Sequence, residues 1–247
     1  MSAVDSTQPT TKSDSRNPSS AVVLHNISKH FGRFVALRQV SANFQSGRLH
    51  VIVGENGAGK TTLLRVIAGL AQATEGRVEV LGTDDLRAVT AKIGYMAHAP
   101  LLYDELDAAG NLRYYAGLYG RADDSAWQQA MKLTGLDPHS ARRVGEYSQG
   151  MRQRLSLARA ILHRPEILLL DEPFSNLDTD SAREIAQLLG RMRDSGNTLL
   201  VVTHQSGLLE GVADDVVRIS AGRLVTPASR ASTMELSKSE HSPAVQA

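Results

Sequence analysis

A glycine-rich segment between an apolar run and a helical pattern constrains the fold of this chain more than any other feature. The apolar run LHVIV (residues 49–53) is typical of a strand buried on both faces. GENGAGKTT (residues 54–62) follows it directly and leads into KTTLLRVIAGL, which has the spacing of a helix. A strand, a glycine-rich turn ending in Gly-Lys-Thr and a helix, in this order, are typical of a phosphate-binding loop. We therefore predict a nucleoside-triphosphate site at the end of this strand.

The residue types in this loop suit contact with phosphate. Glycines let the backbone turn tightly and point successive N–H groups at phosphate oxygens. The Lys60 side chain is expected to reach the β- and γ-phosphates, and the Thr61 hydroxyl is expected to be a ligand of Mg²⁺. The predicted nucleotide-binding residues of the loop are Gly54, Glu55, Asn56, Gly57, Ala58, Gly59, Lys60, Thr61 and Thr62.

The rest of the chain alternates between apolar strands and helical patterns. EILLL (residues 166–170) and NTLLVVT (residues 197–203) have the continuous apolar character of parallel strands, and SAREIAQLLGRMRDSG reads as a helix closed by Gly196. This alternation predicts an α/β fold with a mostly parallel sheet. Together with the phosphate loop, it leads us to expect a P-loop NTPase (RecA-like) core. Residues 98–150 differ, because LLYDELDAAGNLRYYAGLYG and SAWQQAMKLTGL give helical periodicity and no clear strand. They predict a helical lobe inserted into the sheet domain.

Two carboxylates and a histidine follow the ends of predicted strands. Asp171 and Glu172 come directly after an apolar strand, and His204 follows the next one along the chain. Ligands of open α/β sheets gather at the carboxyl ends of the strands, so these side chains are expected to face the phosphate loop. Asp171 would hold Mg²⁺, Glu172 would polarise the attacking water, and His204 would stabilise the charge that develops on the γ-phosphate. With Lys60, Glu172 and His204 are the predicted catalytic residues.

A second possible anion site lies far along the chain. In YSQGMRQRL (residues 147–155), Ser148 and Gly150 precede a helical pattern. The first N–H groups of a helix have no partner within the helix, and the helix dipole adds positive charge there. Since the loop at Lys60 already supplies one phosphate site, the sequence raises the question of which phosphate this helix start would hold.

Bulk composition excludes several classes of protein. The chain has 27 Lys+Arg against 26 Asp+Glu, so no nucleic-acid partner is expected, and its 0 cysteines exclude disulfides and thiol catalysis. No apolar run approaches the roughly 20 residues of a membrane span, and the N-terminus does not read as a signal peptide, so we expect a soluble, cytosolic protein.

Residues 1–20 and 226–247 are polar and are predicted to be tails, the first of them disordered. They flank a predicted ATPase domain at residues 21–225.

Over residues 22–225 the chain resembles the nucleotide-binding subunit of ABC transporters. The matching segments are HFG, GENGAGKTT, YSQGMRQR, ILLLDEP, SNLD and THQ, in that order. The resemblance implies an antiparallel β part on the N-terminal side, ATP and Mg²⁺ as ligands, and a head-to-tail dimer with a second copy or a homologous subunit. It implies that Phe31 stacks on adenine. It also answers the question raised by the second helix start, because the opposite subunit's ATP would be contacted by Ser148, Gln149, Gly150 and Asp178.

The same resemblance implies separate integral membrane subunits and a place on the cytoplasmic face of the membrane. The helical lobe would dock those subunits. Its four tyrosines are interpreted either as a groove for a partner helix or as lobe core, and they are Tyr103, Tyr114, Tyr115 and Tyr119.

The chain departs from the common family pattern at several positions. YSQGM stands where LSGGQ is usual, His98 stands at the linker-loop position where glutamine is common, and Gln205 stands where aspartate often follows the switch histidine. His98, DEPF and THQ together resemble the ATP-binding subunit of the haem exporter of cytochrome c biogenesis.

Other readings stay open at this point. YSQGMRQRL also occurs among related exporters of drugs, polysaccharides and sodium (the ABC-2 type). A soluble ABC ATPase that energises assembly of a protein complex would carry the same motifs. A P-loop kinase or regulatory switch would explain the phosphate loop but not YSQGM and SNLD, and it would not dimerise on ATP.

Overall fold

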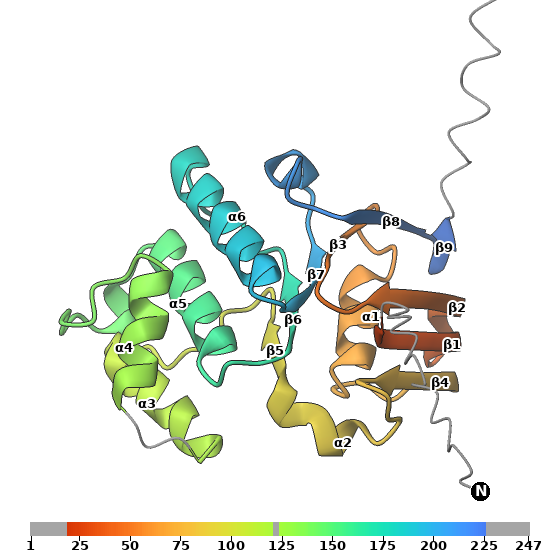
Figure 1. Ribbon diagram of the computed structural model, residues 1–247, viewed down its shortest axis with the longest axis horizontal. Helices are drawn as coiled ribbons and strands as arrows, with labels where there is room; N and C mark the ends of the chain where they lie inside the picture. Colours follow the sequence, from red (N-terminus) through yellow and green to blue (C-terminus); the bar gives the residue numbers. More distant parts are fainter. Residues whose placement is uncertain (1–18, 121–123, 226–247) are drawn as a thin grey trace, which may run out of the picture.

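The computed structural model describes residues 19–120 and 124–225 (Figure 1). Apart from Ser19 and Ser20, the two predicted tails lie outside the described residues. Within these ranges, no helix is both long and apolar enough to cross a membrane.

The centre of the molecule is a six-stranded sheet in the order β5-β6-β7-β3-β8-β9. All neighbouring pairs are parallel except β8 and β9, which are antiparallel. Residues of β3, β6 and β7 are almost entirely buried, because both faces of this part of the sheet are covered, which confirms the parallel-sheet prediction. The strands are β3 (Leu49–Val53), β5 (Ile93–Met96), β6 (Ile167–Asp171), β7 (Thr198–Val202), β8 (Asp215–Ser220) and β9 (Arg223–Val225).

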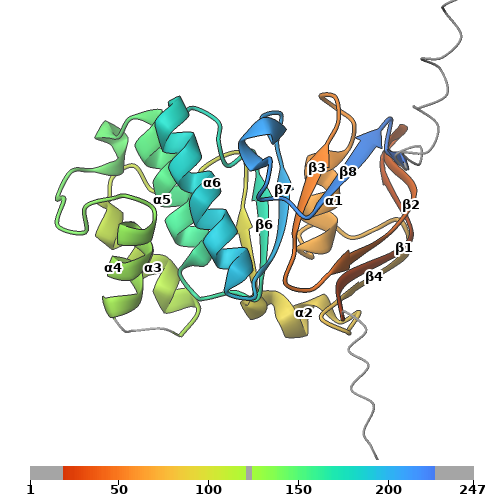
Figure 2. The same cartoon turned by 45° about the horizontal axis from the view of Figure 1, so that its top comes forward.

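A second, antiparallel sheet lies on the N-terminal side, as the resemblance implied. Its strand order is β2-β1-β4, with β1 (Ser20–Phe31), β2 (Phe34–Gln45) and β4 (Glu75–Val80). Helix α1 (Lys60–Ile67) contacts both sheets and buries Leu63, Leu64 and Ile67 in the core that they share (Figure 2). The start of α1 is thereby fixed at the end of β3.

Three helices form the lobe on the opposite side of the central sheet (Figure 1). They are α3 (Ala108–Leu118), α4 (Asp124–Leu133) and α5 (Gln149–Ile161). Helix α5 packs on α3, α4 and β5, so the helical lobe continues past the predicted boundary at residue 150. Helix α6 (Thr179–Asp194) covers the sheet beside α5 and ends just before Gly196, which has φ 97°. The remaining short elements are α2 (Leu86–Val89) and 3₁₀ turns at Thr90–Lys92, Val144–Glu146 and Ser206–Leu209.

The predicted helical periodicity from residue 101 is wrong over residues 101–107. Helix α3 begins only at Ala108, after the N-cap Asp107, whose side chain accepts from the Gly110 N–H at 2.6 Å. The buried Asn111 amide accepts from the Tyr103 N–H at 2.8 Å and donates to the Tyr103 carbonyl at 2.9 Å. These side-chain bonds satisfy the backbone of the preceding segment in a non-helical conformation.

Candidate nucleotide site

The phosphate loop connects the carboxyl end of β3 to the first residue of α1. Lys60 is almost fully buried, and its ammonium donates to the carbonyls of Gly54 and Glu55 at 2.8 and 2.9 Å. The side chain therefore lies over the loop, at the start of a helix whose unpaired N–H groups favour an anion. The loop lines a cavity of about 620 Å³ together with Asp171, Glu172 and His204. The structure thus brings the predicted catalytic residues to one cavity.

Gly59 is a loop position where a side chain would collide with backbone, and this gives a first prediction. Its φ is 106°, and a Cβ there would lie 2.5 Å from the Ala36 carbonyl oxygen, whereas a Cβ at Gly57 (φ 78°) would meet nothing within 4 Å. Gly59→Ala is expected to lower the free energy of unfolding by about 3 kcal/mol, since backbone strain of about 1–2 kcal/mol adds to overpacking. Gly57→Ala, with the backbone strain alone, is the matched control. Denaturant unfolding of the two variants measures the difference, and equal losses would contradict the steric argument.

Asp171 and Thr61 place two oxygen atoms that could be metal ligands side by side beneath the loop. The Thr61 hydroxyl donates to Asp171 Oδ2 at 2.8 Å, and Asp171 is only 1% exposed. A hydroxyl and a carboxylate suit Mg²⁺, which keeps several waters and takes further oxygens from phosphate. Thr61 and Asp171 therefore fit a metal ion that takes its remaining ligands from phosphate and water. Among the described residues there is no group of three or more His, Cys, Asp or Glu side chains that could hold a metal ion.

Glu172 extends the site from the residue after Asp171. Its backbone is left-handed, with φ 54°, and its N–H donates to the Val202 carbonyl at 2.8 Å. Its carboxylate contacts both the backbone and the ring of His204. Oε2 accepts from the His204 N–H at 3.2 Å, and Oε1 lies 3.4 Å from His204 Nε2. Parallel pairing of β6 with β7 explains this, because the residues that follow the two strands leave the same sheet edge.

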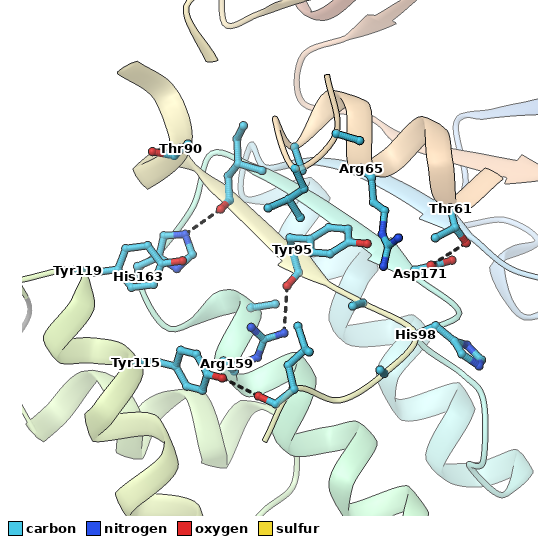
Figure 3. Close-up of a pocket in the computed structure, with 18 of the residues that line it drawn as sticks. Thr61, Arg65, Thr90, Tyr95, His98, Tyr115, Tyr119, Arg159, His163 and Asp171 are labelled. Carbon is cyan, nitrogen blue, oxygen red and sulfur yellow. Dashed lines mark hydrogen bonds between the residues drawn. The ribbon is translucent and has the colours of Figure 1, made fainter. Parts of the chain in front are cut away.

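His98 lies between the phosphate cavity and a second cavity. The second cavity measures about 740 Å³, lies between the helical lobe and α1, and shares Thr61, His98 and Asp171 with the first (Figure 3). His98 therefore lines both the phosphate-loop cavity and the cavity beside the lobe, and its linker-loop role stays a prediction.

The predicted adenine contact lies apart from the phosphate cavity. Phe31 lines the second cavity, with its ring 52% exposed and Lys29 Nζ 4.9 Å from the ring centroid. Phe34, at the start of β2, lines the phosphate cavity instead and is 61% exposed. The stacking role of Phe31 stays a prediction.

The four residues predicted to contact the opposite subunit's ATP do not line the cavity at Lys60. Ser148 is the exposed N-cap of α5, and its hydroxyl accepts from the Met151 N–H at 3.2 Å. Asp178 is the exposed N-cap of α6, and its carboxylate accepts from the N–H and the hydroxyl of Ser181 at 2.9 and 2.7 Å. These bonds hold the pKa of Asp178 below its usual range, so the side chain is a carboxylate at neutral pH. Gln149 is exposed and Gly150 half-buried beside Ser148.

A mostly parallel sheet with this loop at the end of β3, and with a buried aspartate and an adjacent glutamate at the end of β6 on the far side of β7, defines a P-loop nucleoside triphosphatase. The family model for the ABC transporter matches residues 37–175, more than half of the chain. The ATP-binding protein NatA of Bacillus subtilis is 35% identical over 212 residues, which cover 83% of this chain and 86% of that protein. The chain therefore belongs to the ABC transporter family, and it is an ATP-binding, ATP-hydrolysing subunit of that family.

Further relatives differ in what their names say they transport. The bacitracin transport ATP-binding protein BcrA of Enterococcus faecalis is 32% identical over 204 residues, or 81% of this chain, which spans only 66% of that protein's length. A sulfate/thiosulfate import ATP-binding protein of Shewanella oneidensis is 35% identical over 216 residues, 83% of this chain and 60% of that protein. A solved dimeric ATP-binding cassette, MJ0796 bound to ADP and Pi, has a TM-score of 0.77 and 27% identity, covering 83% of this chain and 97% of that one.

Proposed function

We propose that this chain is the ATP-hydrolysing subunit of an exporter, that it dimerises head-to-tail on MgATP, and that it drives separate integral membrane subunits from the cytoplasmic face. The observation that carries the proposal is that the phosphate loop and the two exposed helix starts do not line the same cavity. The phosphate loop and Glu172 form one cavity, whereas Ser148 and Asp178 are exposed and lie outside it. A second copy would complete each site by adding its own helix start to the first copy's phosphates.

Within one site, each residue has a proposed part. Lys60 and the loop N–H groups bind the phosphates, and Thr61 and Asp171 hold Mg²⁺, which when bound neutralises phosphate charge. Glu172 is the general base for the attacking water. His204, 3.4 Å from the Glu172 carboxylate, orients that group and faces the γ-phosphate position. His98 links the phosphates to the lobe.

The cavity between lobe and core has the character of a docking groove for a membrane subunit. Burial lowers the pKa of the Arg159 guanidinium, which donates to the Tyr95 carbonyl at 3.3 Å and lies 5.1 Å from the centroid of the Tyr115 ring. Tyr115 and Tyr119 line the groove, Tyr119 stacked on His163 with ring centroids 4.0 Å apart. Tyr103 and Tyr114 extend it onto the surface, where they are 42% and 47% exposed. These features support the groove interpretation of the four tyrosines over the core interpretation.

The transported substrate is a finer proposal. Haem export for cytochrome c biogenesis is favoured by His98 together with DEPF and THQ. A relative named for bacitracin transport is 32% identical to this chain over the 204 aligned residues, and export of another substrate is the second candidate. Assembly of a protein complex without a membrane partner is the remaining alternative.

Co-purification with membranes tests the transporter proposal. Tagged Glu172→Gln protein, expected to keep ATP bound, is extracted gently from membranes in MgATP, and the co-purifying subunits are identified. Haem or cytochrome c assembly subunits would support the finer proposal, whereas other permease subunits would support export and reject haem. The control is Lys60→Ala, which is expected to bind ATP weakly and therefore not to form the ATP-dependent dimer during the same extraction. Soluble partners alone, across several detergents, would reject the transporter proposal in favour of an assembly ATPase.

A further inference from the structure

A buried glutamine on the first turns of α5 contacts the backbone of Glu172. Gln153 is 3% exposed, and its Nε2 donates to the Glu172 carbonyl at 2.7 Å and to Ser175 Oγ at 3.2 Å. Nothing in the motifs of the sequence indicated this contact, which joins residues 19 positions apart. A buried amide with a well-aimed partner is rarely a simple core filler, because leaving the partner unpaired is costly.

The contact bears on the backbone geometry that aims the Glu172 carboxylate. Glu172 has φ 54°, a conformation that costs free energy for a residue with a side chain. Such a conformation persists only where the surrounding bonds enforce it. Its carbonyl accepts from Gln153, from the Ser175 hydroxyl at 3.0 Å and from the Ser175 N–H at 3.2 Å. The two serine donors belong to the same turn as Glu172, so Gln153 is the one donor to this carbonyl, within residues 19–120 and 124–225, that comes from another element.

Gln153 and Ser148 belong to the same rigid helix. They are five residues apart, about 7.5 Å along the axis. A shift of the α5 N-terminus would therefore move the Gln153 amide against Glu172. The next residue makes a parallel connection, because Arg154 Nη2 donates to Ser181 Oγ at 2.7 Å, and Ser181 Oγ donates to Asp178 at 2.7 Å. The start of α6 at Asp178 is thus connected to α5 through the Ser181 hydroxyl, while Ser148 is the N-cap of α5 itself.

We propose that Gln153 is a positioning residue that transmits contact at the Ser148 helix start to the orientation of the Glu172 carboxylate. The inference rests on the proposed head-to-tail dimer, in which the opposite copy's nucleotide binds at Ser148. Hydrolysis in one site would then depend on the nucleotide held by the other copy. That nucleotide would contact the start of α5, and α5 would orient Glu172 of its own chain through Gln153.

Gln153→Leu tests this role, since it keeps the approximate volume and removes the amide. At saturating MgATP, kcat is expected to fall roughly 10- to 100-fold, the size of effect that a small misplacement of a catalytic group produces. KM is expected to stay within about twofold. ATP-dependent dimerisation, measured by light scattering in the Glu172→Gln background, is expected to persist. Gln129→Leu, at an exposed glutamine of α4, is the matched control and should leave both parameters unchanged.

A double variant separates positioning from a general structural role. If Gln153 acts through Glu172, adding Gln153→Leu to Glu172→Gln should not lower the residual hydrolysis further. Additive losses, a wild-type kcat in folded Gln153→Leu, or loss of dimerisation would each overturn the inference. If Gln153→Leu does not fold, the unbranched Gln153→Met takes its place. Rapid hydrolysis by Glu172→Gln alone would instead reject the proposed function, so the two failures are distinguishable.

Discussion

Glu172→Gln is expected to bind MgATP with an affinity within about twofold of the unchanged chain while its kcat for ATP hydrolysis falls by about 10²–10⁴-fold. The substitution keeps the shape of the side chain and removes its ability to take a proton from water. The residue lies on the cavity wall beside the phosphate loop, and within the described residues its carboxylate contacts His204 and not Lys60 or Thr61. Steady-state hydrolysis at saturating MgATP, with nucleotide binding measured separately, tests the two parts.

Two control variants test whether the loss is specific to the Glu172 carboxylate. Glu210→Gln changes an exposed carboxylate outside the cavity and should hydrolyse ATP at the normal rate. His204→Ala removes the side chain 3.4 Å from Glu172 and should lower kcat less than the glutamate change, because the backbone N–H of residue 204 still donates to Glu172. Rapid steady hydrolysis by purified Glu172→Gln protein would refute the assignment of the general base.

The parts of the fold that local chemistry dictates were predictable. The strand, glycine turn and helix around Lys60 follow from apolar runs and glycines within a few residues of one another, and β3 and α1 begin where these signals place them. The carboxyl ends of β6 and β7 meet at one sheet edge because parallel strands must, which brings Glu172 beside His204.

Features that depend on long-range contacts were not predictable in the same way. The non-helical segment before α3 is held by the Asn111 side chain, whose partner eight residues earlier has no local signal. Gln153 reads as an ordinary polar position in YSQGMRQRL, and only the packing of α5 against the turn after β6 shows that it is buried. That Phe34 lines the phosphate cavity and Phe31 does not depends on which strand end faces the loop, which the sequence alone does not determine.

Lys60→Ala is expected to weaken ATP binding by about 10²–10⁴-fold. The ammonium is held over the loop by the Gly54 and Glu55 carbonyls, so it is already fixed near the position that phosphate oxygens would occupy. Two charge-assisted hydrogen bonds to phosphate, each contributing about 1.5–3 kcal/mol, would account for a loss of this size. Equilibrium titration with ATP, in the presence and absence of Mg²⁺, measures it.

The fold should survive this change, because Lys60 is the first residue of α1 and alanine favours a helix. Thermal unfolding without nucleotide checks that point. Lys92→Ala is the matched control, since Lys92 is exposed, pairs with Glu166 at 3.0 Å and lies outside the cavity; its ATP affinity should be unchanged. An affinity of folded Lys60→Ala protein within tenfold of the unchanged chain would mean that the loop N–H groups alone hold the phosphates. The Lys60 ammonium would then only stabilise the loop through its hydrogen bonds to the Gly54 and Glu55 carbonyls, and its proposed contact with the nucleotide would be wrong.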